Sequence, residues 1–146
     1  MNKLSSAVLS SVIALGLLSG CGDDDSDAQV GIVPPGAPTV LLPATGPSLR
    51  VGETVTFPVE VRAPSGIRNS GFLIVTQRQP NGNTSDSVFN PADFGCVTGD
   101  TFCRSDDFVF RVGANADAGN YQLTFVAVDT TNQTSVPSTL TIFAFR

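Results

Sequence analysis

The sequence predicts an all-β fold of about seven short strands. Apolar and polar residues alternate through several segments, most clearly through residues 54–62. This period of two places successive side chains on opposite faces of a sheet. Turn-forming residues, chiefly Gly, Pro, Asn and Asp, separate these segments. No segment after residue 38 shows the period of an amphipathic helix.

The predicted strands follow one another between residues 39 and 145. Two short first strands cover residues 39–42 and 48–51, and the others cover residues 54–62, 71–76, 85–89, 107–112, 121–127 and 138–145. Pro58 has no N–H to donate, so we expect one side of strand 54–62 to be unpaired or bulged near it. Asn81-Gly82 predicts a hairpin turn between the strands at 71–76 and 85–89.

A short motif before the predicted strand 121–127 resembles immunoglobulin-like domains. Asp117, Gly119 and Tyr121 match the D-x-G-x-Y pattern that these domains carry at the entrance to their sixth strand. The resemblance implies that the Tyr121 hydroxyl bonds back to the backbone of the preceding corner. Residues 52–59 resemble the second-strand pattern of the same family. The implied fold is an Ig-like antiparallel β-sandwich over residues 38–146.

The chain departs from antibody domains at three places. Val59 and Leu123 stand where those domains carry the two cysteines of the inter-sheet disulfide, and the sequence has no tryptophan. We therefore expect an apolar contact between Val59 and Leu123, with Phe72 or a neighbour filling the middle of the core. A jelly roll or a small barrel is also compatible with the alternating strands.

The first twenty residues predict a secretory signal peptide. Lys3 precedes an apolar run that is too short to span a bilayer and that ends in small residues. Residues 18–21, LSGC, resemble a bacterial lipobox. The resemblance implies cleavage before Cys21, acylation of Cys21 and attachment to the lipid bilayer of a bacterial cell envelope. An aspartate after the lipidated cysteine favours inner-membrane retention; here Gly22 follows it, which favours the outer membrane.

Residues 21–37 predict a flexible linker. An acidic run at 23–27 is followed by prolines at 34 and 35, and both features keep a chain extended and without a core. The acidic run lacks the spaced, glycine-containing pattern of a calcium loop. The domain organisation is therefore a signal peptide at 1–20, a lipidated linker at 21–37 and one domain at 38–146.

Composition narrows the range of functions. The chain has no histidine, which excludes Ser/His and Cys/His nucleophile pairs and imidazole metal ligands. Its eight basic residues are dispersed and its net charge is −5, so we expect no nucleic-acid partner. We predict no enzyme activity, no cofactor and no bound metal. A hydrolase acting through aspartates is the low-ranked alternative.

Cys96 and Cys103 are predicted to form a disulfide. With Cys21 assigned to lipid, these two remain as a pair in a chain that matures in an oxidising compartment. They lie within residues 90–106, an interruption of the strand rhythm, and long ordered insertions are often functional. A two-residue turn at 99–100 would make this segment a self-paired, disulfide-closed finger.

Two hypotheses follow for the finger. In one, it is a recognition element with Phe94, Val97, Phe102 and Arg104 as contact residues. In the other, which we favour from the sequence, the disulfide only tethers the loop and Phe102 packs onto the core, because buried aromatics outnumber exposed ones.

Aspartates near the finger offer one more possibility. Asp93, Asp100, Asp106 and Asp107, together with Asp129, would have to gather to hold calcium. Aspartates in turns are usually solvated turn-formers, so we do not predict a calcium site.

The sequence thus predicts a lipid-anchored envelope protein that displays an Ig-like binding or scaffolding domain. The expected partner is another envelope protein, a glycan or a host surface. The main alternative is a subunit of an envelope assembly that works by strand addition, suggested by the β-rich segment 139–145.

Overall fold

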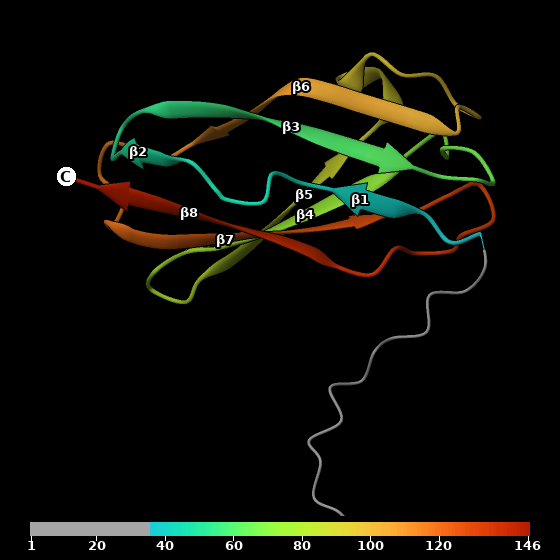
Figure 1. The fold of residues 1–146 in the computed structure, drawn as a ribbon. Helices are drawn as coiled ribbons and strands as arrows, with labels where there is room; N and C mark the ends of the chain where they lie inside the picture. The colour runs from blue at the N-terminus through green and yellow to red at the C-terminus, as the bar shows by residue number, and fades with distance from the viewer. Residues whose placement is uncertain (1–35) are drawn as a thin grey trace, which may run out of the picture. The chain divides into compact units, whose positions relative to one another are not determined.

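The computed structural model of the chain describes residues 36–146. The predicted signal peptide, the lipid attachment at Cys21 and nearly all of the linker 21–37 lie outside the described residues. Within residues 36–146, eight strands and one short 3-10 helix form two facing sheets (Figure 1). None of the helical structure in this range is long and apolar enough to cross a membrane.

The two sheets differ in size. The smaller sheet has the order β1-β3-β6, with bounds β1 Thr39–Leu41, β3 Thr54–Arg62 and β6 Phe102–Arg111. The larger sheet has the order β2-β8-β7-β4-β5, with bounds β2 Ser48–Arg50, β8 Ser138–Phe145, β7 Gly119–Ala127, β4 Leu73–Arg78 and β5 Thr84–Phe89. All neighbours are antiparallel except β2 and β8, which run parallel. The fold is an Ig-like β-sandwich, as predicted.

Alternate residues of the strands fill the space between the sheets. Val59 and Leu123, which replace the inter-sheet cysteines, are both buried in one continuous core cluster. Phenylalanines take the place of the missing tryptophan. Phe108 is their centre, with ring centroids 5.3 Å from Phe57 and 5.4 Å from Phe125. Phe72 is fully buried as expected.

Two local predictions are confirmed. The pairing of β3 with β6 shifts register between Phe57 and Val59, so a bulge lies at Pro58. A tight hairpin joins β4 to β5, with the N–H of Gly82 donating to the carbonyl of Gln79 at 2.9 Å. Gly82 has a φ of 88°, a conformation that glycine adopts without steric cost.

Strand β6 is longer than the sequence indicated. It begins at Phe102, not at residue 107, and its first half pairs with the end of β3, Phe102 opposite Arg62. The bulge at Pro58 breaks the alternation of β6 near Asp106 and Asp107, which made this stretch resemble a loop. The predicted interruption at 90–106 therefore reduces to the 3-10 helix η1, Pro91–Phe94, and residues 95–101.

The segment at 139–145 is not a free strand. It belongs to β8, which is paired on one side with β7 and on the other with β2. Residues 143–145 therefore have strand neighbours on both sides, and residues 138–142 are paired with β7 on one side. This corrects the observation on which the strand-addition alternative rested.

Candidate functional site

Three loops are joined at one end of the sandwich. They are residues 63–72, 90–101 and 128–137. The N–H of Gly99 donates to the carbonyl of Ile67 at 2.8 Å, and the N–H of Ile67 donates to the carbonyl of Asp100 at 2.8 Å. The N–H of Thr130 donates to the carbonyl of Gly66 at 2.9 Å. These bonds satisfy backbone groups and fix the three loops relative to one another.

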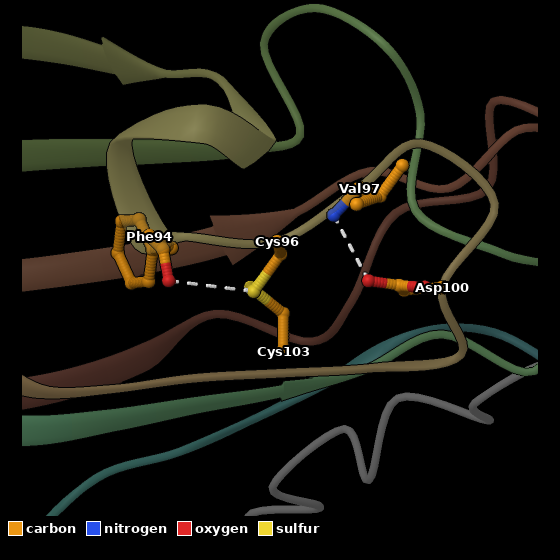
Figure 2. The surroundings of a disulfide bond; sticks show 5 residues. All are labelled: Phe94, Cys96, Val97, Asp100 and Cys103. Carbon is orange, nitrogen blue, oxygen red and sulfur yellow. Dashed lines mark hydrogen bonds between the residues drawn. A yellow bond between two sulfur atoms is a disulfide. The ribbon is translucent and has the colours of Figure 1, made fainter.

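The predicted disulfide between Cys96 and Cys103 is present at this end of the sandwich. Its Cα atoms are 5.8 Å apart, within the usual range for a disulfide. Cys103 is buried in β6, while Cys96 follows η1 (Figure 2). The Cys96 sulfur also lies 3.5 Å from the carbonyl oxygen of Phe94. The disulfide therefore holds the loop after η1 against the first residues of β6.

The predicted finger geometry is wrong. The N–H of Asp100 donates to the carbonyl of Val97 at 3.1 Å, and the N–H of Val97 donates to the Asp100 carboxylate at 2.9 Å (Figure 2). The turn is thus centred on residues 98–99, one position earlier than expected. Thr101 does not pair within the loop, because its carbonyl accepts from the N–H of Ala63 at 2.9 Å. Beyond its own turn at 97–100, the end of the loop pairs with residues 63–67 and not with residues 96–98.

The four candidate contact residues lie in different environments. Phe94 is buried, with its ring centroid 5.3 Å from that of Phe72, so it belongs to the core. Val97 is 67% exposed and Phe102 is 49% exposed. Arg104 is also exposed. The hypothesis that Phe102 packs onto the core is therefore wrong, and three of the four candidates remain available to a partner.

Phe102 lies on the outer face of the smaller sheet beside a chain of charges. Arg62 contacts Glu60 at 2.7 Å, Glu60 lies 3.9 Å from Arg104, and Arg104 contacts Asp106 at 2.6 Å. We call this surface the Phe102 face; it consists of Leu41, Glu60, Arg62, Phe102 and Arg104. A hollow of about 180 Å³ beside it is lined by Leu41, Leu42, Pro43, Pro58, Glu60 and Arg104.

The aspartates near the loop do not gather. Among residues 36–146, no group of three or more His, Cys, Asp or Glu side chains is placed to hold a metal ion. Asp93 accepts from the N–H of Asn90 at 2.7 Å and so caps η1. Asp100 and Asp106 make the local contacts described above.

Asp129 differs from the other candidate aspartates, which are exposed, because it is completely buried. Its Oδ1 accepts bonds from the N–H and hydroxyl of Thr131 and from the N–H of Gln133, each at 2.8 Å. Burial raises the pKa of Asp129, but the hydrogen bonds lower it by more, so the net pKa is below the ordinary value of 3.8. The sequence offered no sign of this role, since Asp129 stands among ordinary turn residues.

The corner before β7 has the geometry that the Ig-like motif implies. The Tyr121 hydroxyl donates to the carbonyl of Asp117 at 2.8 Å, and the Tyr121 ring is buried. Burial, and next the nearby Asp117 carboxylate, raise the pKa of the Tyr121 hydroxyl. Gly119 has a φ of 139°, and a Cβ there would lie 3.0 Å from Pro80. The motif therefore connects the β-sandwich corner to the β4–β5 hairpin.

Comparison with known proteins identifies no family. No protein-family model matches the chain, and no curated protein matches it. Among solved structures it is similar to a mutant of the SrpA adhesin from Streptococcus sanguinis, with 17% identity over 75% of this chain and 55% of that one and a TM-score of 0.45. It is similar to the sporulation control protein Spo0M from Bacillus subtilis, with 13% identity over 76% of this chain and 50% of that one and a TM-score of 0.43.

A third similarity is to fibronectin(III)-like modules of CbhA from Clostridium thermocellum, with 15% identity over 74% of this chain and all of that one and a TM-score of 0.37. The chain thus spans about half the length of the first two proteins. At these identities the likeness concerns the arrangement of strands alone.

Proposed function

We propose that this protein is a lipid-anchored bacterial envelope protein whose β-sandwich binds a protein partner through the Phe102 face. The observation that carries the proposal is the half-exposed Phe102 ring at the start of β6, a strand that pairs with β3 and is joined to Cys96 through the next residue, Cys103. An exposed aromatic side chain next to arginines is the composition typical of the energetic centre of protein interfaces.

The backbone under Phe102 is rigid for two reasons. Phe102 pairs with Arg62 in the sheet, and its neighbour Cys103 is covalently bound to Cys96. A partner that contacts Phe102 would therefore have little backbone to order on binding, which lowers the entropic cost of association. The disulfide contributes to binding through this rigidity.

The charges of the Phe102 face supply specificity. Glu60 lies between Arg62 and Arg104, and both arginine side chains are more exposed than the glutamate. Partly exposed ion pairs contribute little to stability, yet they fix the orientation of the two guanidinium groups. A partner with an apolar pocket for Phe102 and carboxylates beside it would match this surface.

Membrane attachment is the second part of the proposal. The support is the lipobox-like sequence at residues 18–21, and the residue after Cys21 favours the outer membrane. The acidic linker, as a flexible coil of about sixteen residues, has a root-mean-square reach of roughly 20–25 Å. That reach would hold the domain clear of the lipid headgroups.

The binding surface can be tested by comparing two substitutions on β6. Phe102→Ser removes the exposed ring, and Val109→Ser is a matched control because Val109 is 61% exposed on the same strand. The full chain, produced in a bacterium that exports it, is cross-linked in intact envelopes and its partners are identified. Wild type and Val109→Ser should cross-link the same protein, and Phe102→Ser should reduce the yield at least about tenfold.

Two outcomes would contradict this use of the Phe102 face. One is an equal cross-linking yield for wild type and Phe102→Ser. The other is an equal loss in both variants, which would mean that Phe102 has no special role. The anchor is tested separately by Cys21→Ser, which should abolish labelling with palmitate and release the protein from the membrane fraction.

A further inference from the structure

A second exposed surface lies on the outer face of the larger sheet, and it is independent of the Phe102 face. Phe143 and Phe145, two residues apart on β8, are 50% and 37% exposed. Their ring centroids are 6.5 Å apart and their planes differ by only 24°. The Arg50 guanidinium, on the neighbouring β2, lies 5.9 Å from the centroid of the Phe145 ring. β2 and β8 run side by side (Figure 1).

Polar side chains continue this surface across the sheet. Asn120 on β7 is paired with Phe143, and Gln122 is paired with Arg78 on β4. These side chains point away from the core, because the intervening Tyr121 is buried. Arg78, Asn120 and Gln122 line a hollow of about 350 Å³, together with Gln79, Pro80 and Gly82.

The side chains form one strip with an arginine at each end. We call it the β8 strip; it consists of Arg78, Gln122, Asn120, Phe143, Phe145 and Arg50. It crosses from β4 through β7 and β8 to β2, which is three strand spacings. Adjacent strands are about 4.8 Å apart, so the strip is about 14 Å wide, comparable to a few linked sugar rings.

The guanidinium groups of the strip are not neutralised by direct ion pairs. Within residues 36–146, neither Arg50 nor Arg78 takes part in an ion pair. The lining of the hollow includes no carboxylate. The Glu53 carboxylate accepts from the backbone N–H of Arg50 at 3.0 Å, and the Asp117 carboxylate lies 3.3 Å from the amide nitrogen of Asn81. Asp86, on β5, shares the outer face of the sheet with Arg78 but forms no ion pair with it. A ligand with carboxylate groups would complement the two guanidinium groups.

The chemistry of the strip suits a saccharide better than a protein. A pyranose ring has a C–H-rich face that packs on a phenyl ring, and its hydroxyls both donate and accept, as amide side chains do. A protein interface of standard size needs an apolar centre within about 800 Å² per partner. Here the strip is separated from the apolar side chains on the same sheet face, Ile74, Val88 and Val126, by threonines at 76, 124, 139 and 141, so the exposed apolar side chains do not form one centre.

We propose that the β8 strip binds a short stretch of an acidic polysaccharide. Sugar rings pack on Phe143 and Phe145, sugar hydroxyls bond with the amides of Asn120 and Gln122, and sugar carboxylates pair with Arg78 and Arg50. The strip and the Phe102 face lie on different sheets, so this binding does not require the protein partner proposed above.

The test uses defined oligosaccharides and the full chain, purified in detergent from bacteria that export it and immobilised on a biosensor. The acidic probes are hexamers of galacturonate, of mannuronate and of hyaluronan. The fully methyl-esterified galacturonate hexamer has the same backbone without charge, and hexaglutamate has the charge without sugar. At least one acidic saccharide should bind with a dissociation constant below about 1 mM, and the ester and the peptide should bind at least about tenfold more weakly.

Three substitutions then locate the site. Phe143→Ser should weaken binding of the acidic hexamer at least about tenfold, because it removes the central ring. Arg78→Gln should weaken the acidic hexamer by a similar factor and leave the weak binding of the ester unchanged. Val88→Ser is the matched control, since Val88 is 62% exposed on β5 of the same sheet, and it should change nothing.

The proposal is overturned if no acidic hexamer binds, if hexaglutamate or the ester binds as tightly, or if Phe143→Ser binds like wild type. Thermal unfolding of each variant shows that a loss of binding does not come from a loss of folding. Phe102→Ser should bind the hexamer normally. A saccharide that fails to bind while the Phe102-dependent cross-link persists would reject this proposal alone.

Discussion

Replacing the buried carboxylate of Asp129 by an amide should reveal how the loop end is held together. In Asp129→Asn the shape of the side chain is kept, and the three donors from Thr131 and Gln133 still have an oxygen to bond with. Hydrogen bonds to a charged group contribute about 1.5–3 kcal/mol and those between neutral groups about 0.5–1.5 kcal/mol. Three weakened bonds would therefore cost about 3 kcal/mol.

Part of this loss of folding free energy is offset, because a neutral amide costs less to bury than a carboxylate. In the fold, burial disfavours the charged form of Asp129 and the hydrogen bonds favour it. Because the pKa of Asp129 is lowered, the hydrogen bonds have the larger effect. We therefore expect Asp129→Asn to lower the free energy of unfolding by about 1–2 kcal/mol near neutral pH. Asp86→Asn, at an exposed aspartate of β5, is the control and should change it by less than about 0.5 kcal/mol.

The pH dependence makes the prediction specific. The folded-state pKa of Asp129 lies below 3.8, the value expected in the unfolded chain. Its contribution to stability is therefore complete above the unfolded-chain value of 3.8 and is lost as the pH falls from there through the folded-state pKa. Urea unfolding should show a constant gap between wild type and Asp129→Asn above about pH 5 and a narrowing gap toward about pH 2. A gap that stays the same over this whole range would refute the reasoning.

Three further substitutions test other parts of the fold. Replacing Cys96 and Cys103 by alanine should lower the free energy of unfolding by up to about 2.5 kcal/mol, the loop-closure value for this ring, and reductant should then have no further effect on the denaturation midpoint. Gly46→Ala should cost more than about 2 kcal/mol, because a Cβ at Gly46 overlaps a backbone carbonyl of β8, whereas the control Gly113→Ala has open space and should be nearly neutral in thermal unfolding. Tyr121→Phe should cost about 1 kcal/mol by urea unfolding, since it removes one hydroxyl bond and no packing; unchanged stability would mean that the corner bond contributes nothing.

The strands with strong local signals were predictable. Residues 54–62 alternate without interruption, and Asn81-Gly82 specifies its own turn, so each can be recognised without knowing what lies across the sheet. The motif around Tyr121 was informative for a similar reason, because its hydrogen bond joins residues only four positions apart. Local chemistry determines these features.

Features set by distant partners were not predictable. The start of β6 at Phe102 depends on pairing with β3, forty residues earlier, and the turn after Val97 depends on the backbone of residues 63–67. Phe94 is in the core because rings from three other elements surround it: Phe72 before β4, Phe89 at the end of β5 and Phe108 in β6. No pattern within residues 90–101 contains this information.

The candidate sites, like the fold, were predictable from the sequence only in part. The disulfide could be expected from cysteine number and compartment, and Phe102 was recognised as a candidate, although its exposure was not. The β8 strip was not predicted, because the end of β8 is apolar on both faces. Ile142 and Ala144 are buried while Phe143 and Phe145 are exposed, and an alternation of apolar residues with apolar residues does not reveal which set faces the core.

The parallel pairing of β2 with β8 imposes an order on events during synthesis. Ser48 pairs with Phe143 and Arg50 with Phe145, so β2 cannot join the larger sheet until residue 145 has left the ribosome. The smaller sheet needs nothing beyond residue 111 and can form much earlier. A nascent chain would therefore stay incomplete, with one half of the sandwich uncovered, for as long as its last strand is still enclosed.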